Sequence, residues 1–210
     1  MGKTVDKTIS FNGQLNSQFT FFGRGYWSEF AKKYVPSTKP QMSVSVEWVA
    51  EYVTSERAKA QTVELRQMMA TATDQQLRDY KLLHFDAVAA AGVFSYGSAA
   101  GLMVRSPYIV VDIDDLSSTD EARAIQQILI ADTEVKTALC FVSPKALGVK
   151  WWCVLPEWCQ GLDFAEQYAT LSRYIGYQYG IAADPTGSNV NRLCFLPYDP
   201  QCYLNKSLTL

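Results

Sequence analysis

An apolar segment that ends in three carboxylates is the feature that most restricts what this chain can fold into. The stretch YIVVDIDDLSST spans residues 108–119, and its first half reads as a buried strand. An ionised carboxylate in a low-dielectric interior is costly unless hydrogen bonds, a basic partner or a metal ion compensate it. Helix capping accounts for Asp114 and Asp115 but not for Asp112, which lies inside the apolar run. We therefore expect a compensating group close to Asp112.

The spacing of these acids is compatible with a cation site. Side chains two residues apart on a strand leave the same face, so Asp112 and Asp114 have Cα atoms roughly 6 to 7 Å apart and can grip one cation or two. Asp115 either points the other way or starts the turn. Taken alone, the D-x-D pattern fits a turn as well as a metal site. Asp184, at the end of the apolar segment IAAD that we expect to be a strand, is a natural third carboxylate.

Composition narrows the class of protein. The chain has 210 residues with 48% hydrophobic content, enough for one large domain or two fused modules. The N-terminus has no apolar signal region and no run is long enough to span a bilayer, so we expect a cytoplasmic protein without a membrane partner. The net charge of −2 gives no global attraction to phosphate backbones, so nucleic-acid binding needs a local basic patch.

Cysteine and histidine usage excludes several kinds of site. The five cysteines are an odd set without a C-x-x-C pair, which favours reduced, buried thiols. His84 is the only histidine. A two-histidine metal site and a HUH-type nicking site, which needs a histidine pair, are therefore excluded, and we interpret His84 as an ordinary structural residue.

The order of patterns along the chain predicts an α+β fold. We expect a hairpin-type turn at Asn12-Gly13. Residues 43–83 have mostly helical spacing, with a second helix after Thr73-Asp74. The glycines within residues 89–104 suggest strands or a hairpin that other backbone approaches closely. A helix from about Ser118, capped with Glu121, and an amphipathic helix ending at Gly180 alternate with strands at 108–113, 137–143, 149–156, 181–184 and 191–197. We expect helices on one face of the sheet. The proposed division is a strand and helix module at residues 1–80 and a core at residues 81–210, packed as one compact unit.

A hairpin between the acidic segments adds a basic group. The stretch SPKALGVKWW sets Ser143, Gly148 and Lys150 around a turn, with Lys150 near the start of the return strand. Paired carboxylates, a distal Asp and a basic hairpin are what metal-dependent nucleotidyl transfer needs, because carboxylates bridge the metal ions and donors hold the triphosphate.

At these residues the sequence resembles the primase-polymerase branch of the archaeo-eukaryotic primase superfamily. It is most similar to the VirE N-terminal domain family of bacterial mobile elements. The resemblance runs from about residue 43 to the end, through ERAKAQTVELRQ, KLLHFDAVAAAGVF, YIVVDIDDL, SPKALGVKWW and DPTGSNVNRLCFLPYDPQCYLN. It implies a primase-polymerase-like fold with an RRM-like antiparallel sheet and an active-site cleft between that sheet and the N-terminal α/β module.

The resemblance also implies roles for single residues. Asp112 and Asp114 match the first primase motif and Asp184 the third, so the three would be catalytic and hold two Mg²⁺ or Mn²⁺ ions. Ser143 and Lys150 fall in the second motif, which contacts the incoming nucleotide. Active primase-polymerases usually carry a histidine where this chain has Lys150, and lysine offers a point charge without imidazole geometry.

The function expected from these residues is a DNA primase/polymerase-type nucleotidyltransferase for replication or mobilisation of a mobile element. Its partners would be nucleoside triphosphates, single-stranded or primed DNA, and a replicative helicase or another replication protein of the element. The alternative is a catalytically inactive primase-derived domain that binds nucleic acid or a partner.

Two further features have two interpretations each, and a third has one. Arg192 either binds the triphosphate, which we favour, or pairs with a carboxylate. The segment FFGRGYWSEFAKKY either stacks and tracks single-stranded DNA or, as we favour, forms a strand and a helix that bury its aromatic residues. Trp151 and Trp152 must face opposite sides of their strand, so at least one is expected in the core.

Overall fold

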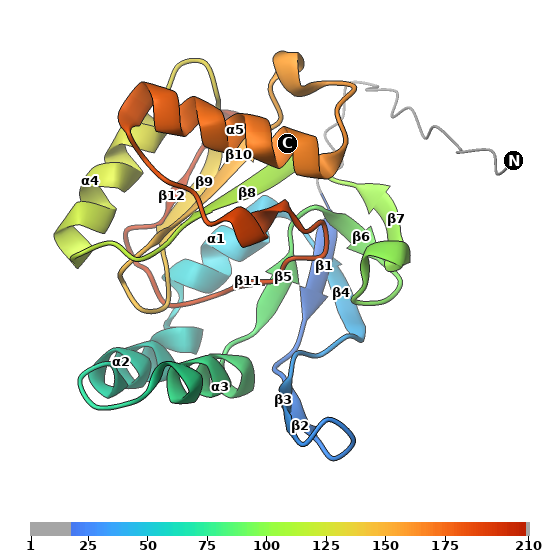
Figure 1. Cartoon of the computed structure of the whole chain (residues 1–210), viewed down its shortest axis with the longest axis vertical. Coiled ribbons are helices and arrows are strands. Elements are labelled where there is room, and N and C mark those ends of the chain that lie inside the picture. The colour runs from blue at the N-terminus through green and yellow to red at the C-terminus, as the bar shows by residue number, and fades with distance from the viewer. Residues whose placement is uncertain (1–17, 209–210) are drawn as a thin grey trace, which may run out of the picture.

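The structure is a computed structural model that describes residues 18–208 (Figure 1). The turn predicted at Asn12-Gly13 lies outside the described residues. Within them the chain is mixed α+β with antiparallel sheets, as the sequence predicts. Two four-stranded sheets form its centre, and two two-stranded hairpins extend from it. No helix in this part of the chain is long and apolar enough to cross a membrane.

The first sheet joins strands that are far apart in the sequence. Its order is β11-β5-β1-β4, with bounds β1 Phe19–Phe22, β4 Pro40–Val44, β5 Ala87–Ala89 and β11 Cys194–Phe195. β1 lies in the middle and pairs antiparallel with both β4 and β5. Strands from both sides of the boundary proposed at residue 80 therefore contribute to one sheet, and the division into two modules stays a prediction.

The second sheet contains the acidic strand. Its order is β12-β9-β10-β8, with bounds β8 Tyr108–Ile113, β9 Thr137–Val142, β10 Val149–Val154 and β12 Tyr203–Leu204. β10 lies between β8 and β9 and is antiparallel to both. In this register Lys150 lies directly opposite Asp112, so their side chains leave the same face of the sheet.

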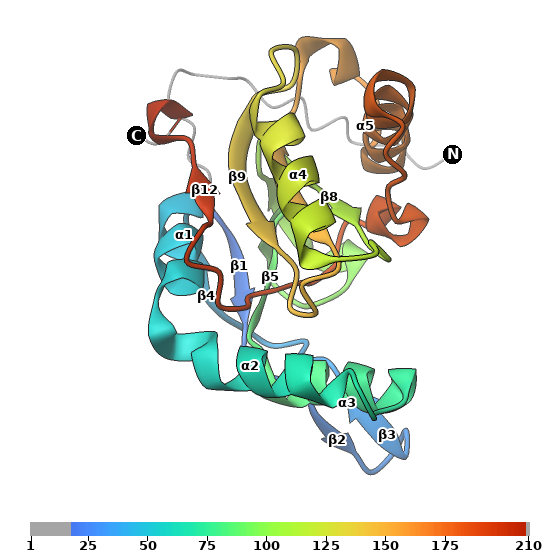
Figure 2. The same ribbon diagram turned by 90° about the vertical axis from the view of Figure 1, so that its left-hand side faces the viewer.

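Both faces of the second sheet are buried. Trp151 packs with residues of α4 (Thr119–Ile130) and α5 (Phe164–Tyr179), whereas Trp152 packs with α1 (Val46–Thr54) and β1. Figure 2 shows α4 and α5 on one side of this sheet and α1 with the first sheet on the other. The two tryptophans face opposite cores, as strand geometry predicts, and neither is exposed. The expectation of helices on one face was incomplete, because α1 and the first sheet cover the second face.

Capping residues set the helix ends that the sequence indicates. α3 (Asp74–His84) begins after Thr73 with a capping box to Gln76, and α5 ends at Gly180 in the left-handed conformation with φ +68°. α2 spans Lys59–Met68, and short 3₁₀ turns cover Glu56–Ala58, Ala99–Gly101, Glu157–Cys159, Pro185–Ser188 and Lys206–Leu208. At α4 the expected capping box is altered, because the Glu121 carboxylate accepts from the backbone and hydroxyl of Ser117.

Two hairpins complete the fold. β6 (Gly92–Phe94) pairs with β7 (Leu102–Arg105), and a Cβ on Gly92 would lie 2.0 Å from the carbonyl oxygen of Val104, which confirms the close backbone approach expected at this glycine. β2 (Tyr26–Ser28) pairs with β3 (Lys33–Val35). The strand expected at the start of FFGRGYWSEFAKKY is β1, where Phe21 and Phe22 are buried as expected. The helix expected after it is absent, and Tyr26, Trp27 and Phe30 are exposed instead of buried. A two-stranded ribbon has no second layer of structure to cover these side chains.

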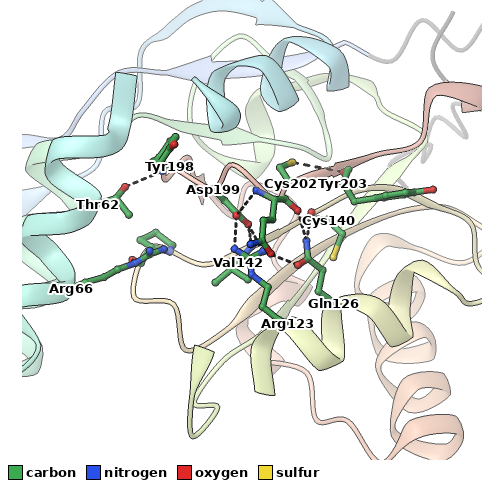
Figure 3. Close-up of polar contacts among 12 residues, drawn as sticks. Thr62, Arg66, Arg123, Gln126, Cys140, Val142, Tyr198, Asp199, Cys202 and Tyr203 are labelled. Carbon is green, nitrogen blue, oxygen red and sulfur yellow. Dashed lines mark hydrogen bonds and ion pairs between the residues drawn. The ribbon is translucent and has the colours of Figure 1, made fainter. Parts of the chain in front are cut away.

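A buried ion pair fastens the C-terminal segment to the second sheet (Figure 3). Asp199 is 1% exposed and accepts hydrogen bonds from Arg123 of α4 at 2.5 and 2.9 Å and from the backbone N–H of Val142 at 2.7 Å. The N–H of Tyr198 donates to Thr62 of α2 at 2.9 Å. Residues 198–199 thus connect α2, α4 and β9.

The cysteines and the histidine have structural surroundings. All five cysteines are free thiols, and four of them are buried, as expected for a reduced protein: Cys140, Cys153, Cys159 and Cys194. His84 stacks on Tyr80 with ring centroids 4.2 Å apart at the end of α3.

Candidate metal centre

Three carboxylates converge at the end of β8. One oxygen each of Asp112, Asp114 and Asp184 can be chosen so that all lie within 4.8 Å of one another. Asp112 lies on β8, and Asp114 follows the strand immediately before Asp115, whose φ of +59° turns the chain away. The convergence expected from the order of motifs is confirmed, while what the acids bind stays a prediction.

Asp184 reaches this site by a route that the sequence does not indicate. Residues 181–184 form no strand, and Asp184 instead caps the 3₁₀ turn Pro185–Ser188. Its N–H donates to the carbonyl oxygen of Asp112 at 2.7 Å, so this extended segment lies along the free edge of β8. One backbone hydrogen bond is too few for a strand, but it places the third carboxylate beside the first.

Lys150 compensates the buried Asp112. Its ammonium forms an ion pair with Oδ1 of Asp112 and lies 3.9 Å from Oδ1 of Asp114. Only 11% of the Lys150 side chain and 10% of the Asp112 side chain are exposed. This confirms that Lys150 points toward the acids. Its place in the hairpin motif predicts an exposed cleft lysine that contributes little to the core, and this prediction is wrong, because its strand is covered on both faces.

The pKa values of Asp112 and Lys150 both lie above their ordinary values, but for different reasons. Burial raises the pKa of Asp112, and Lys150 offsets only part of that effect. Burial lowers the pKa of Lys150, but the negative charges of Asp112 and Asp114 outweigh burial, so its pKa lies above the ordinary value. Oδ1 of Asp112 is buried and accepts no hydrogen bond in good geometry from the described residues. The ammonium of Lys150 is therefore the cation that compensates this buried oxygen.

Asp184 is held in its ionised form by its neighbours. The backbone N–H and the hydroxyl of Thr186 donate to it at 2.9 and 2.6 Å, and Arg192 lies 3.2 Å from Oδ2. Burial opposes ionisation, but these donors lower the pKa of Asp184. Arg192 thus adopts the carboxylate-pairing role that we considered less favoured, with 47% of its side chain exposed toward the cavity.

The hairpin between β9 and β10 packs tightly against the acids. The N–H of buried Ser143 donates to the carbonyl oxygen of Gly148 at 2.8 Å and closes the turn. A Cβ on Gly148 would lie 2.4 Å from the carbonyl oxygen of Ile113 and 2.8 Å from Oδ1 of Asp114. Glycine is therefore required here, because any side chain would displace Asp114.

These groups line one cavity of about 1360 Å³. This volume exceeds the 300–1,000 Å³ that is usual for small-molecule pockets, so the cavity has room for a nucleotide and more. All six residues singled out from the sequence line its wall: Asp112, Asp114, Ser143, Lys150, Asp184 and Arg192. The structure therefore brings together the whole expected set.

Three basic residues on the cavity wall were not recognised in the sequence. Arg78 and Lys81 lie three residues apart on α3, and Lys145 lies in the β9–β10 hairpin. No ion pair engages them within residues 18–208. Burial and the neighbouring charges of Lys150 and Lys145 lower the pKa of Lys81 to about 8. The three-residue spacing of Arg78 and Lys81 places both on one face of α3, and this could be read from the sequence. It does not indicate which other element that face approaches. We call these three residues the basic wall.

Comparison with known proteins places the chain in a family. A family model described as BT4734-like, N-terminal domain matches residues 83–204, which is more than half of the chain. The chain belongs to the BT4734-like N-terminal domain family. The BT4734-like region includes the three carboxylates and Lys150, while Arg78 and Lys81 precede it. No curated protein and no solved structure matches the chain.

Proposed function

We propose that this protein is a metal-dependent nucleotidyltransferase of the primase-polymerase type. The observation that carries the proposal is the convergence of Asp112, Asp114 and Asp184 at a cavity that also has a basic wall. Carboxylates repel phosphates unless a metal ion lies between them. A site with acids that can bind a metal and basic groups that can bind phosphate therefore suits a ligand that carries both.

The residues fit Mg²⁺ or Mn²⁺. Three carboxylates supply the hard oxygen ligands that these ions prefer. When bound, such ions activate a hydroxyl nucleophile and stabilise the charge on the phosphates. The BT4734-like fold contributes the rigid strand β8 and the capped turn at Asp184, which hold the ligand oxygens in place.

The basic residues divide into two groups under this proposal. Lys150 and Arg192 are paired with the acids and neutralise two of their three negative charges. The basic wall has no such partner, so Arg78, Lys81 and Lys145 would position a triphosphate together with the hydroxyl of Ser143. This assignment extends the expected nucleotide-binding set of Ser143, Lys150 and Arg192.

The topology supports the resemblance to primase-polymerases and the VirE N-terminal domain. The succession β8-α4-β9-β10-α5, with β10 between β8 and β9, is a split βαβ arrangement. The segment 181–184 runs along the free edge of β8, where an RRM-like sheet has its last strand. These features suit the RRM-like description, with β12 as an addition beside β9.

The position of Lys150 favours a second candidate function. Its ammonium lies where a cation shared by Asp112 and Asp114 would be expected, and it takes the place of the usual motif histidine. A domain whose acids are already neutralised can bind nucleic acid or a replication partner without catalysis. Under this alternative the metal is dispensable.

The two functions differ in what the acids do. Binding of a labelled nucleoside triphosphate with Mn²⁺ and extension of a DNA primer should both be present in the wild type and lost in Asp112→Asn and Asp184→Asn. Asp115→Asn is the matched control, because Asp115 is an exposed cavity residue outside the cluster and asparagine tolerates its positive φ. Nucleotide binding without extension would support the non-catalytic alternative. Absence of metal-dependent nucleotide binding would refute the proposal.

A further inference from the structure

The β2–β3 hairpin exposes aromatic side chains that nothing in the described structure covers. It projects from the body of the protein, away from both four-stranded sheets (Figure 1). Phe30 in its turn is wholly exposed, and Tyr26 and Trp27 are 54% and 45% exposed. Trp27 and Tyr34 are directly opposite each other and meet edge to face with ring centroids 5.1 Å apart. Exposed aromatic rings on one projecting element indicate a binding surface.

The same segment is basic although the chain as a whole is acidic. Residues 24–39 contain one acidic residue, Glu29, and four basic residues: Arg24, Lys32, Lys33 and Lys39. Glu29 accepts from both Lys32 and the indole N–H of Trp27, which leaves Lys33 and Lys39 exposed and outside the ion pairs of residues 18–208. The chain has the local basic patch that its net charge of −2 does not supply.

The hairpin is fixed next to the cavity. The N–H of Gly25 donates to the carbonyl oxygen of Leu82 on α3 at 2.6 Å, and a Cβ on Gly25 would lie 2.4 Å from the carbonyl oxygen of Val35. Pro36, which follows β3, lines the cavity together with Lys81 and Leu82. The base of the hairpin therefore forms part of the cavity rim, and its aromatic end points outward (Figure 2).

We propose that the β2–β3 hairpin binds single-stranded nucleic acid and leads the strand to the cavity. Aromatic rings provide stacking platforms for bases of any sequence, and the lysines attract the phosphates between them. A surface that binds a protein partner is expected to carry fewer charges of one sign than this hairpin does. The choice of nucleic acid over protein also rests on the proposed function of the cavity, because a polynucleotide is the second substrate of nucleotidyl transfer.

The test measures binding of fluorescein-labelled 15-nucleotide oligothymidylate and oligouridylate to the full chain by anisotropy, in EDTA and without nucleoside triphosphate. Trp27→Ala and Phe30→Ala are each expected to weaken binding between about 5-fold and 150-fold, the usual effect of removing a stacking residue. Trp158→Ala and Tyr177→Ala are matched controls, since these residues are 44% and 93% exposed elsewhere on the surface. The controls should bind as the wild type does.

A salt series separates phosphate contacts from stacking. Lys33→Ala should make the dependence of the association constant on salt less steep by about 0.7 for each lost contact to a single strand. Lys136→Ala, an exposed lysine in the α4–β9 loop, should leave the slope unchanged. The wild-type affinities for the two oligonucleotides, compared at one salt concentration, would show which strand is preferred.

The outcomes distinguish this inference from the proposed function. Because the assay contains neither metal nor nucleoside triphosphate, it measures strand binding at the hairpin independently of nucleotide binding at the acids. Equal affinities of Trp27→Ala, Phe30→Ala and wild type would overturn the inference, whatever the acids do. Failure of the wild type to bind either oligonucleotide would also overturn it, as would hairpin-dependent self-association in sedimentation experiments without nucleic-acid binding.

Discussion

Replacing Lys150 with methionine should destabilise the fold before it affects any chemistry. Methionine keeps much of the side-chain volume but removes the ammonium that compensates Asp112, whose side chain is only 10% exposed. Removing one partner of a buried ion pair costs about 3–5 kcal/mol, because the remaining charge loses its compensation. For a chain of this size each kcal/mol shifts the melting temperature by roughly 2–4 °C. We therefore expect Lys150→Met to lower Tm by roughly 6 to 20 °C.

A double-variant cycle tests the reason for this loss. Urea unfolding in EDTA at pH 7 should show most of the lost stability restored in Lys150→Met/Asp112→Asn, because neither partner is then charged. Lys145→Met is the matched control, since Lys145 lines the same cavity without an ion pair, and its effect should stay within about 0.5 kcal/mol. An additive cycle, with the two changes independent, would show that the pair does not compensate Asp112.

Metal should rescue the single variant if the acids form a cation site. A bound ion at 100 times its dissociation constant stabilises the folded state by about 2.7 kcal/mol. Mn²⁺ should therefore raise the Tm of Lys150→Met more than that of the wild type, in which the ammonium competes for the same oxygens. An equal Tm with and without Mn²⁺ in both proteins would refute cation binding at this cluster.

Four further predictions concern Lys81, Asp199 and Gly148. Nucleoside triphosphate affinity should fall as pH rises through about 8, where Lys81 loses its charge, and Lys81→Arg should abolish this fall. Since the folded pKa of Lys81 is below the ordinary 10.5, the unfolded state holds more protons between these values and stability itself should rise with pH over that range, as urea unfolding can check. Asp199→Asn should lower the free energy of unfolding by about 3 kcal/mol in urea unfolding, because Arg123, whose side chain is only 25% exposed, loses the buried carboxylate that balances its charge. Gly148→Ala should weaken Mn²⁺ binding measured by calorimetry, because its Cβ meets the Ile113 carbonyl, whereas Gly176→Ala on α5, with its nearest neighbour at 3.7 Å, should bind Mn²⁺ normally.

Features set by neighbouring residues were predictable from the sequence. The starts of α3 and α5 and the end of α5 follow from capping residues, which act within a few positions of the chain. Side chains alternate between the two faces of β8 and β10, because a strand has a period of two residues. This alternation places Trp151 and Trp152 in opposite cores. The acids could be identified as candidate site residues because Asp112 lies inside an apolar run. Local structural propensity does not explain a carboxylate at that position.

Features set by distant contacts were not predictable in the same way. The 181–184 segment looks like a strand in sequence, yet its backbone makes one hydrogen bond to β8. Lys81 looks like an ordinary helix lysine until α3 is placed against the β9–β10 hairpin. Trp27 and Phe30 are of residue types that are usually buried. They are exposed because no second layer of the described structure covers the hairpin. In each case the outcome depends on segments that are far apart in the chain. The residues near each position do not indicate which distant segment will contact it.

The sheet order has a consequence for synthesis of the chain on the ribosome. β11 and β12, which lie on the edges of the two four-stranded sheets, both come from residues 194–204, and Asp184 precedes them by only ten residues. A nascent chain that ends after α5 has neither edge strand, no third carboxylate and no Asp199 to neutralise Arg123. Pairing across such long separations is slow, because the chain must close large loops first. The site and the sheets are thus completed together and late, so a shortened product lacks the cluster of three carboxylates.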